Sequence, residues 1–370
     1  MREYLLVLLF AVGATYLLGG LCRRFAFRFN AVAQVRGRDV HTQPVPYFGG
    51  VAMLCGLAAA FLLAANLPWL GSFELVWHDT RGVLLGALVI CAVGVIDDMV
   101  ELNAVVKGAG VLLAASVAVI CGVKFYWVPL PGAVYTIDEG TSIAVTLILV
   151  FVSANAINLV DGLDGLAVGV VGIGAAAFFT YAYVLAVEQE LVRATTSSIV
   201  TVATVGVCLG FLPHNVHKAK MFMGDSGALL LGYLMAVSVI SLTGQLDPAR
   251  VDVDGASAFA AYLPLVLPFA VMALPLIDMC MAYFRRSVRG QKWWEPDKQH
   301  LHHRMLGLGY GHRQAVALLW LWSAVVSFGV VFVGLAPNGY TITALCAGLL
   351  LAAFLTWGRV ALRRLRAVAR

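Results

Sequence analysis

Two adjacent aspartates, Asp97 and Asp98, stand in the segment GVIDDMVELN at the end of an apolar run. Adjacent carboxylates repel each other, and a divalent cation or a cation-bound phosphate is the usual remedy. Lys107 lies nine residues after Asp98 and is placed to reach back toward the pair and bind an anion. The alternatives are a solvated acidic turn and, for Lys107, a side chain that extends to the membrane interface. The segment therefore predicts part of a metal-assisted phosphate site.

A second acidic segment, NAINLVDGLDGLA, also ends an apolar run. Asp161 and Asp164 are three residues apart and so share one edge of a helix, with Asn158 a further three residues back. Gly162 and Gly165 allow backbone or ligand to approach closely. Capping of a polar helix end is the alternative. It does not explain why other short loops repeat the pattern.

The third segment, MFMGDSGALLLGY, places Asp225 in a glycine turn directly before an apolar helix. Backbone N–H groups and the helix dipole favour phosphate at such an N-terminus, and an aspartate there suits a metal bound to that phosphate. A plain helix cap is the alternative. A lone GDSG also occurs in unrelated hydrolases, so this segment is informative only together with the others.

A histidine cluster follows in the segment HLHHR, which contains His300, His302, His303 and Arg304. Zinc is one interpretation, but no cysteine is near, and the aspartates elsewhere are hard oxygen ligands suited to Mg²⁺. Contact with phosphate or handling of protons is therefore favoured over zinc. A purely structural role for the imidazoles is the remaining alternative.

These polar segments belong to a very apolar chain. Of its 370 residues, 61% are hydrophobic and 12% charged, with a mean hydropathy of +0.89, which predicts an integral membrane protein. The seven cysteines fall in or beside apolar runs and are typical of small core residues. Runs long enough to cross a membrane are expected near 4–22, 48–66, 82–96, 104–122, 142–160, 165–187, 197–213, 227–243, 259–284, 314–335 and 341–357. The prediction is an all-α polytopic membrane protein, a bundle of about eleven transmembrane helices, with kinks expected at the prolines of the ninth run.

The distribution of basic residues predicts the orientation of this bundle. With eleven spans, the connecting loops alternate sides, and one side carries 20 of the 25 Lys and Arg residues. Basic loops stay in the cytoplasm, so the N-terminus is expected outside and the C-terminus inside. The acidic segments and the histidine cluster all fall on the cytoplasmic side. We expect one transmembrane catalytic domain over 1–357, followed by a basic cytoplasmic tail over 358–370.

Acid clusters for Mg²⁺, a glycine turn at a helix N-terminus, a lysine, histidines and an arginine are the parts of a phosphoryl-transfer site. The sequence contains no GxxxxGK[ST] loop, which argues against a P-loop ATPase. A site at the mouth of a membrane bundle predicts one soluble anionic substrate and one lipid substrate. The alternative from another class is a multi-span transporter of an anionic solute. Against it, the charged motifs gather on one face and not at the bilayer midplane.

The motifs together resemble a known family. DDxxxLxxxxK at 97–107, NAINLVDGLDGL at 155–166, FMGDSGxLxLGY at 222–233 and HLHHRxLxLG at 300–309 are similar to those of the polyprenyl-phosphate N-acetylhexosamine-1-phosphate transferases of glycosyltransferase family 4. These enzymes are related to phospho-MurNAc-pentapeptide translocase. The resemblance implies transfer of N-acetylhexosamine-1-phosphate, with GlcNAc favoured, from a UDP-sugar to a polyprenyl phosphate. The reaction releases UMP and makes the first lipid-linked intermediate of a bacterial cell-surface glycan.

The same resemblance implies roles for individual residues. Asp225 and Asp98 are expected to be metal ligands, with Mg²⁺ as the cofactor and Mn²⁺ as the alternative ion. Asp98 is favoured over Asp97 as the group that deprotonates or orients the lipid phosphate. A covalent aspartyl intermediate stays open. The expected catalytic residues are Asp97, Asp98, Asp161, Asp164, His302 and His303, and of these Asp161 and Asp164 are expected to hold the nucleotide sugar or the metal. The remaining implied roles are substrate binding by Lys107 and Asn158, uridine contact by Asn215 and Phe222, and diphosphate or sugar contact by His300, His302, His303 and Arg304.

The sequence departs from the pentapeptide translocases at PVPYFGG, where those enzymes typically have PTMGG, and at HLHHRML, where they have a longer histidine run. Both departures favour the smaller UDP-N-acetylhexosamine donor. The expected partners are this nucleotide sugar, the polyprenyl phosphate and the membrane, with no nucleic acid, and a homodimer stays open. The expected location is the bacterial inner membrane, with the active site on the cytoplasmic face.

Overall fold

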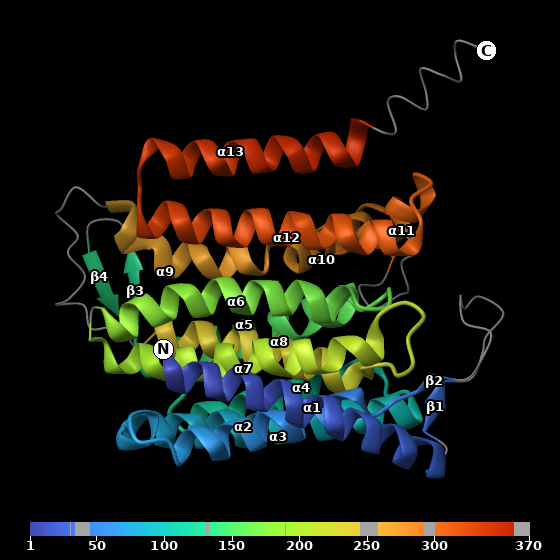
Figure 1. Cartoon of the computed structure of the whole chain (residues 1–370), viewed down its shortest axis with the longest axis horizontal. Coiled ribbons are helices and arrows are strands. Elements are labelled where there is room, and N and C mark those ends of the chain that lie inside the picture. Colours follow the sequence, from blue (N-terminus) through green and yellow to red (C-terminus); the bar gives the residue numbers. More distant parts are fainter. Residues whose placement is uncertain are drawn as a thin grey trace.

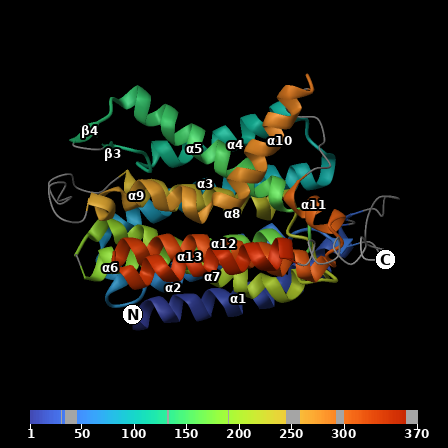
Figure 2. The same cartoon turned by 90° about the horizontal axis from the view of Figure 1, so that it is seen from above.

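A computed structural model describes residues 1–29, 31–33, 45–130, 133–188, 190–244, 258–291 and 300–358. Most of these residues are helical, and most of the long helices run side by side along one direction (Figures 1 and 2). The α-helices are α1 Arg2–Arg28, α2 Gly49–Ala65, α3 Glu74–Val100, α4 Ala104–Ile120, α5 Glu139–Val160, α6 Leu166–Val187, α7 Val192–Asn215, α8 Gly224–Thr243, α9 Ala258–Val271, α10 Ala273–Val288, α11 Leu301–Gly307, α12 His312–Leu335 and α13 Gly339–Ala353. Two short turns of helix complete the set, η1 Leu70–Ser72 and η3 Phe354–Gly358. Of the predicted tail over 358–370, all but Gly358 lies outside the described residues.

Eight of the described helices are long and apolar enough to cross a membrane: α1, α3, α5, α6, α7, α8, α12, and α13 together with η3. The prediction of an all-α polytopic membrane protein is confirmed at this level. Each of the eleven apolar runs coincides with a helix or, for the ninth run, with the pair α9 and α10. Since α2 and α4 have 17 residues each, the count of eleven spans stays a prediction. The orientation of the termini also stays a prediction.

Helix α8 is the centre of the bundle, because every residue from Ser226 to Thr243 is buried. Helices α3 and α5 pack directly against it. Their approach depends on glycines, since a Cβ added at Gly94 of α3 would clash with the backbone of Ser226, and one added at Gly232 would clash with Ala154 of α5. This packing brings the ends of α3 and α5, which carry the two acidic segments, beside the beginning of α8.

The ninth apolar run is broken in two, as its prolines predicted. Helix α9 ends at Val271 and α10 begins at Ala273, with Met272 as the N-cap between them. The amide of Met272 still donates to the carbonyl of Pro268 at 3.2 Å. Pro275 falls in the first turn of α10, where its missing N–H leaves no intrahelical hydrogen bond unmade. Figure 2 shows α10 turning away from the line of α9.

The purely α-helical prediction was too simple in one respect. Two antiparallel pairs of short strands are present: β1 Val32–Ala33 with β2 Val45–Pro46, and β3 Trp127–Leu130 with β4 Ala133–Thr136. Helical periodicity carries no signal for such short pairs, although the Pro-Gly between β3 and β4 is a typical turn sequence. The first pair leads into α2, which begins beside the start of α8, since the amide of Gly49 donates to the carbonyl of Phe222 at 3.2 Å.

Candidate active site

Asp98, near the end of α3, caps the beginning of α8. Its two carboxylate oxygens accept hydrogen bonds from the backbone N–H groups of Asp225 at 2.7 Å and Ser226 at 3.2 Å. These amides have no acceptor inside their own helix, and the helix dipole favours a negative charge at this place. Gly224 adopts a φ of +67°, and a Cβ there would clash with the Asp98 carboxylate. The anion position at the start of α8, which the sequence suggested for phosphate, is therefore taken by Asp98.

Lys107 lies between two of the predicted acids. Its ammonium group contacts Asp97 Oδ2 at 2.8 Å and Asp225 Oδ2 at 2.5 Å, and it donates to Asn158 Oδ1 at 3.2 Å. The amide nitrogen of Asn158 in turn donates to Asp225 Oδ1 at 2.5 Å. The other oxygen of Asp97 accepts from the backbone N–H of Leu102 at 2.7 Å, which fixes the turn after α3. Predicted residues from four helices thus meet in one network.

Asp161, at the end of α5, lies beside this network. Burial, followed by the negative charges of Asp225, Asp98 and Asp164, raises the pKa of Asp161 to about 8. A carboxyl group near neutral pKa, close to three other carboxylates, is a typical position for a divalent cation or a proton to be held. Asp161 therefore belongs to the same acidic centre, because the negative charges of Asp225 and Asp98 act on its carboxyl group.

Asp164, three residues later, binds a different segment. Its Oδ2 accepts from the backbone N–H of Ala219 at 3.1 Å and lies 3.2 Å from His217 Nδ1. Asn215 supports the same turn, because its Oδ1 accepts from Gly165 N at 2.9 Å and its Nδ2 donates to the Met221 carbonyl at 3.0 Å. Both residues tie the turn between α5 and α6 to the loop that precedes α8. Uridine contact by Asn215 stays a prediction; the geometry shows a structural bridge.

The histidine cluster lies against the turn that carries Asp161. A Cβ added at Gly162 would clash with the His302 ring, so glycine is what allows this contact. His302 is 4% exposed, and burial lowers the pKa of its imidazole to about 4. It is therefore neutral at physiological pH and not a cation. His303 and Arg304 are exposed on the same short helix, α11.

His300 is held by Asp278, a residue to which the sequence assigned no chemistry. The Asp278 carboxylate lies 3.1 Å from His300 Nδ1 and accepts from the backbone N–H of Leu301 at 2.9 Å. Asp278 thereby anchors the first turn of α11 to α10. The only sequence signal for this role was an acid within an apolar run. Phe222, the other predicted uridine contact, is half-buried, with its ring centroid 6.3 Å from that of Tyr47.

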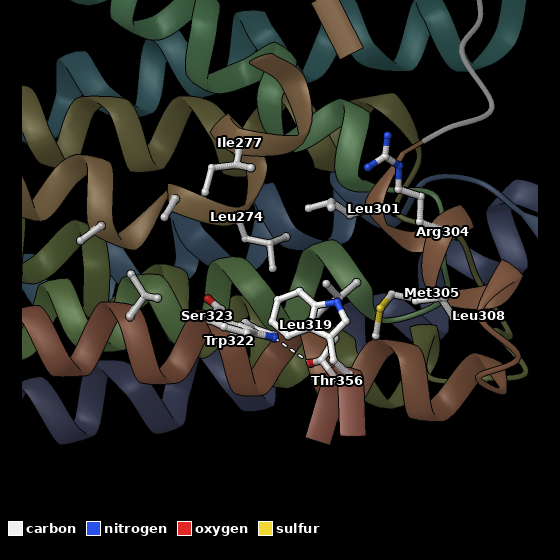
Figure 3. A pocket seen from close by; sticks show the side chains of 14 residues that line it. Leu274, Ile277, Leu301, Arg304, Met305, Leu308, Leu319, Trp322, Ser323 and Thr356 are labelled. Atoms are coloured by element: carbon white, nitrogen blue, oxygen red, sulfur yellow. Dashed lines mark hydrogen bonds between the residues drawn. The ribbon is translucent and has the colours of Figure 1, made fainter. Parts of the chain in front are cut away.

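An apolar cavity of about 650 Å³ lies among α10, α11 and α12 (Figure 3). Arg304 and Leu301 line it from α11, Leu274 and Ile277 from α10, and Trp322 from α12. In Figure 3 the Arg304 side chain lies at one end of the cavity, and Ser323 and Thr356 are the other labelled residues with polar side-chain oxygens in a mainly apolar lining. The cavity can hold a hydrocarbon chain while a guanidinium group contacts an attached anion.

The donor set of the acidic centre fits Mg²⁺. Its potential ligands are hard carboxylate and amide oxygens, which Mg²⁺ prefers, and no thiol or imidazole takes part in the network of Asp97, Lys107, Asn158 and Asp225 as the structure describes it. The Lys107 ammonium already balances part of the negative charge there, and the same negative charge would attract a divalent cation. Asp225, Asp98 and Asp161 are the residues that could hold such an ion.

Comparisons with known proteins show the family to which this chain belongs. The profile of glycosyl transferase family 4 matches residues 80–243, which contain both acidic segments and Asp225. The chain is 42% identical, over 89% of its length and 82% of the relative, to the decaprenyl-phosphate N-acetylglucosaminephosphotransferase of Mycolicibacterium smegmatis. It is 25% identical, over 84% and 78%, to the undecaprenyl-phosphate alpha-N-acetylglucosaminyl 1-phosphate transferase of Escherichia coli K12. A phospho-N-acetylmuramoyl-pentapeptide-transferase from Desulforudis audaxviator is 37% identical over 58% of this chain and 68% of the relative. The chain belongs to glycosyl transferase family 4.

Proposed function

We propose that this protein transfers GlcNAc-1-phosphate from UDP-GlcNAc to a polyprenyl phosphate. An oxygen of the lipid phosphate attacks the sugar-bearing phosphorus, the bond to the bridging oxygen breaks, and UMP leaves with that oxygen. The product is a polyprenyl-diphospho-GlcNAc. The activities for which the relatives are named support the reaction. The observation that carries it is the convergence of Asp98, Lys107 and Asp225 at the start of the central helix.

Mg²⁺ is proposed as the cofactor, held by Asp225 and Asp98 with Asp161 close by, and Mn²⁺ is the alternative ion. When bound, such an ion neutralises charge on the diphosphate and on the leaving UMP. Lys107 would exchange its contacts with Asp97 and Asp225 for a diphosphate oxygen. Asp98, or Asp97 beside it, would orient the lipid phosphate. A covalent aspartyl path remains an alternative within the same site.

The loop before α8 and the helix α11 would bind the donor. Phe222 offers an aromatic face for the uracil, and Asn215 and Asp164 would position the turn beside it. His302, neutral and buried, would donate or accept a hydrogen bond, while His303 and Arg304 would contact the diphosphate or the sugar. His300 would act through Asp278 by fixing the first turn of α11.

The apolar cavity is proposed to hold the first isoprene units of the acceptor. Its lining is almost wholly apolar, and Arg304 supplies a positive charge for the lipid phosphate. The cavity lies against α11, the helix that also carries His302, so a lipid seated there has its head group near the acidic centre.

The site is proposed to face the cytoplasm of a bacterium, from a single multi-pass domain in the inner membrane. The excess of basic residues on this side supports the orientation. In a cysteine-depleted background, a cysteine at His303 should be protected from an impermeant reagent in intact cells, and one at Lys124 should be labelled. Labelling of position 303 from outside would overturn the orientation.

The activity is tested with purified protein, Mg²⁺ and decaprenyl or undecaprenyl phosphate. A panel of radiolabelled UDP-sugars should give lipid-linked product and UMP in equal amounts, with UDP-GlcNAc preferred. Chelation of divalent ions should stop the reaction, and added Mg²⁺ should restore it. Asp225→Asn should abolish turnover. Solute uptake into vesicles without UMP release would favour the transporter alternative instead.

A further inference from the structure

We propose a second metal site, for a transition-metal ion such as Zn²⁺, formed by Asp164, His217 and His312. One ligand atom from each residue lies within 4.8 Å of the other two. The site differs from the proposed magnesium centre in its donors, because the Asp164 carboxylate lies beside the His217 imidazole and accepts from the loop before α8, while its charge also acts on Asp161. It does not depend on the proposed function.

Three distant segments bring these ligands together. Asp164 is in the turn between α5 and α6, His217 follows the end of α7, and His312 is the first residue of α12. The two imidazole rings are stacked, with centroids 4.3 Å apart and planes inclined by 26°. His217 Nδ1 lies 3.2 Å from Asp164 Oδ2. The ligands are therefore gathered by the fold before any ion binds.

Hydrogen bonds hold two of the three ligands in place. The N–H of Ala219 donates to Asp164 Oδ2 at 3.1 Å, and the guanidinium of Arg313 donates to the His217 carbonyl at 3.2 Å. Asp164 is 8% exposed, and both histidines are half-buried. Hydrogen bonds that fix the ligand-bearing segments in this way are typical of metal sites in which outer contacts orient the ligands.

The donor set selects the class of ion. Two imidazole nitrogens and one carboxylate oxygen suit Zn²⁺, Co²⁺ or Ni²⁺, whereas Mg²⁺ prefers oxygen ligands alone. Tetrahedral Zn²⁺ at the usual bond lengths needs ligand atoms roughly 3.3 Å apart, so the two stacked imidazoles must rotate to aim their nitrogens at one ion. Three protein ligands leave a fourth position for water.

An ion bound here would cross-link the start of α12 to two segments. One is the turn between α5 and α6, which carries Asp161 and Asp164, and the other is the loop between α7 and α8. Both segments must stay in position for the acidic centre, and the loop leads directly into Gly224 and Asp225. Occupation of this site would make the region more rigid. The expected effect of the ion is therefore on the position of these segments around the acidic centre.

The test uses the full-length protein in detergent, first stripped with a chelator and then titrated with Co²⁺. In excess Mg²⁺, which keeps the proposed magnesium centre occupied, wild type should bind one Co²⁺ per chain with the visible absorption of a low-coordinate nitrogen-ligated ion, and Zn²⁺ should displace it while further Mg²⁺ should not. His217→Gln and His312→Gln should each weaken binding at least tenfold. His78→Gln is the control, because its side chain is 70% exposed at the beginning of α3 and far in sequence from the three ligands.

Equal Co²⁺ binding by wild type and His217→Gln would overturn the site, as would loss of the signal on addition of Mg²⁺. If a glutamine variant does not fold, X-ray absorption at the zinc edge of the wild-type protein decides the question. Two imidazoles in the first coordination shell are expected, and a shell without imidazole would refute the proposal. Neither measurement involves turnover, so failure here leaves the proposed transferase reaction untouched.

Discussion

The backbone N–H of Asp225 donates to the carboxylate of Asp98 at 2.7 Å, which joins the end of α3 to the beginning of α8 across 127 positions of the sequence. The Asp98 carboxylate thus holds the backbone at the start of α8, which carries the Asp225 side chain. The start of α8 cannot serve as a bare phosphate-binding helix terminus, because a side chain of the protein already fills it. Charge balance at the site must therefore come from cations, namely Lys107 and the proposed Mg²⁺.

Asp98→Asn tests whether Asp98 only caps helix α8 or also takes part in the transfer reaction. Asparagine keeps one acceptor oxygen but no charge, so the free energy of unfolding should fall by only about 1 kcal/mol, as for other helix caps. UMP release should fall at least a hundredfold. Asp138→Asn is the matched control, since Asp138 caps α5 through the Thr141 N–H at 2.9 Å, well apart in sequence from the acidic centre.

The control variant should lose similar stability with turnover unchanged. Thermal unfolding of both proteins, together with UMP release at saturating substrates, makes the comparison. If both variants keep full activity, Asp98 has a structural role only.

Lys107→Met tests whether the Lys107 ammonium group balances the negative charges of Asp97 and Asp225. Removing one partner of a buried ion pair typically costs about 3 to 5 kcal/mol, and this substitution leaves Asp97 and Asp225 without their shared ammonium group. We expect lower stability without metal, tighter Mg²⁺ binding because the competing ammonium group is gone, and slower turnover. Mg²⁺ titration followed by thermal unfolding measures the first two effects.

Lys124→Met is the comparison for that experiment. Lys124 pairs with Glu139 at 3.0 Å, but the glutamate side chain is 77% exposed. Exposed pairs contribute roughly 0 to 1 kcal/mol, so this variant should be close to wild type in stability and in Mg²⁺ affinity. Weaker Mg²⁺ binding by Lys107→Met would mean that Lys107 does not compete with the ion.

The convergence of the acidic segments follows from physical chemistry that the sequence already contains. Charged groups are costly in hydrocarbon, so acids at the ends of apolar runs must gather at one aqueous face. Loop alternation and basic-residue counts then place Asp97, Asp161 and Asp225 together. Helix existence was equally predictable, because long apolar runs have no alternative backbone structure in a membrane.

Individual partners were not predictable, because they depend on how the helices pack. Nothing in the sequence distinguishes Asp98, which caps α8, from Asp97, which binds Lys107. The same limit applies to Asp278 beneath His300, and to Asp164, which binds the loop although Asp161 faces the acidic centre. Three-residue spacing implies one helix edge, but α5 ends at Val160, so the two aspartates point to different neighbours.

Gly224→Ala should damage the site through geometry alone. A side chain at a φ of +67° is strained, and the added Cβ would clash with the Asp98 carboxylate. We expect a loss of about 1 to 3 kcal/mol in stability and a loss of turnover. Gly13→Ala is the control, because a Cβ on this residue of α1 meets nothing within 4 Å. Unchanged activity in Gly224→Ala would show that the Asp98 contact is dispensable.

The stability of the metal-free protein should fall as pH rises from about 4 to about 8. The pKa of Asp161 is raised to about 8 in the folded protein by burial and by Asp225, Asp98 and Asp164, against an ordinary value of 3.8. The folded state therefore binds a proton that the unfolded chain releases throughout this window, and unfolding becomes easier at each step until the folded protein also loses the proton.

Asp161→Asn should reduce that dependence, because the amide is neutral at every pH, and it should be more stable than wild type at pH 9 without metal. Thermal midpoints in chelator from pH 5 to pH 9 measure the effect. If Mg²⁺ binds here, it competes with the proton, so adding Mg²⁺ at pH 7 should release protons into a weakly buffered solution, and fewer from the variant. Equal proton release from both proteins would place the ion away from Asp161.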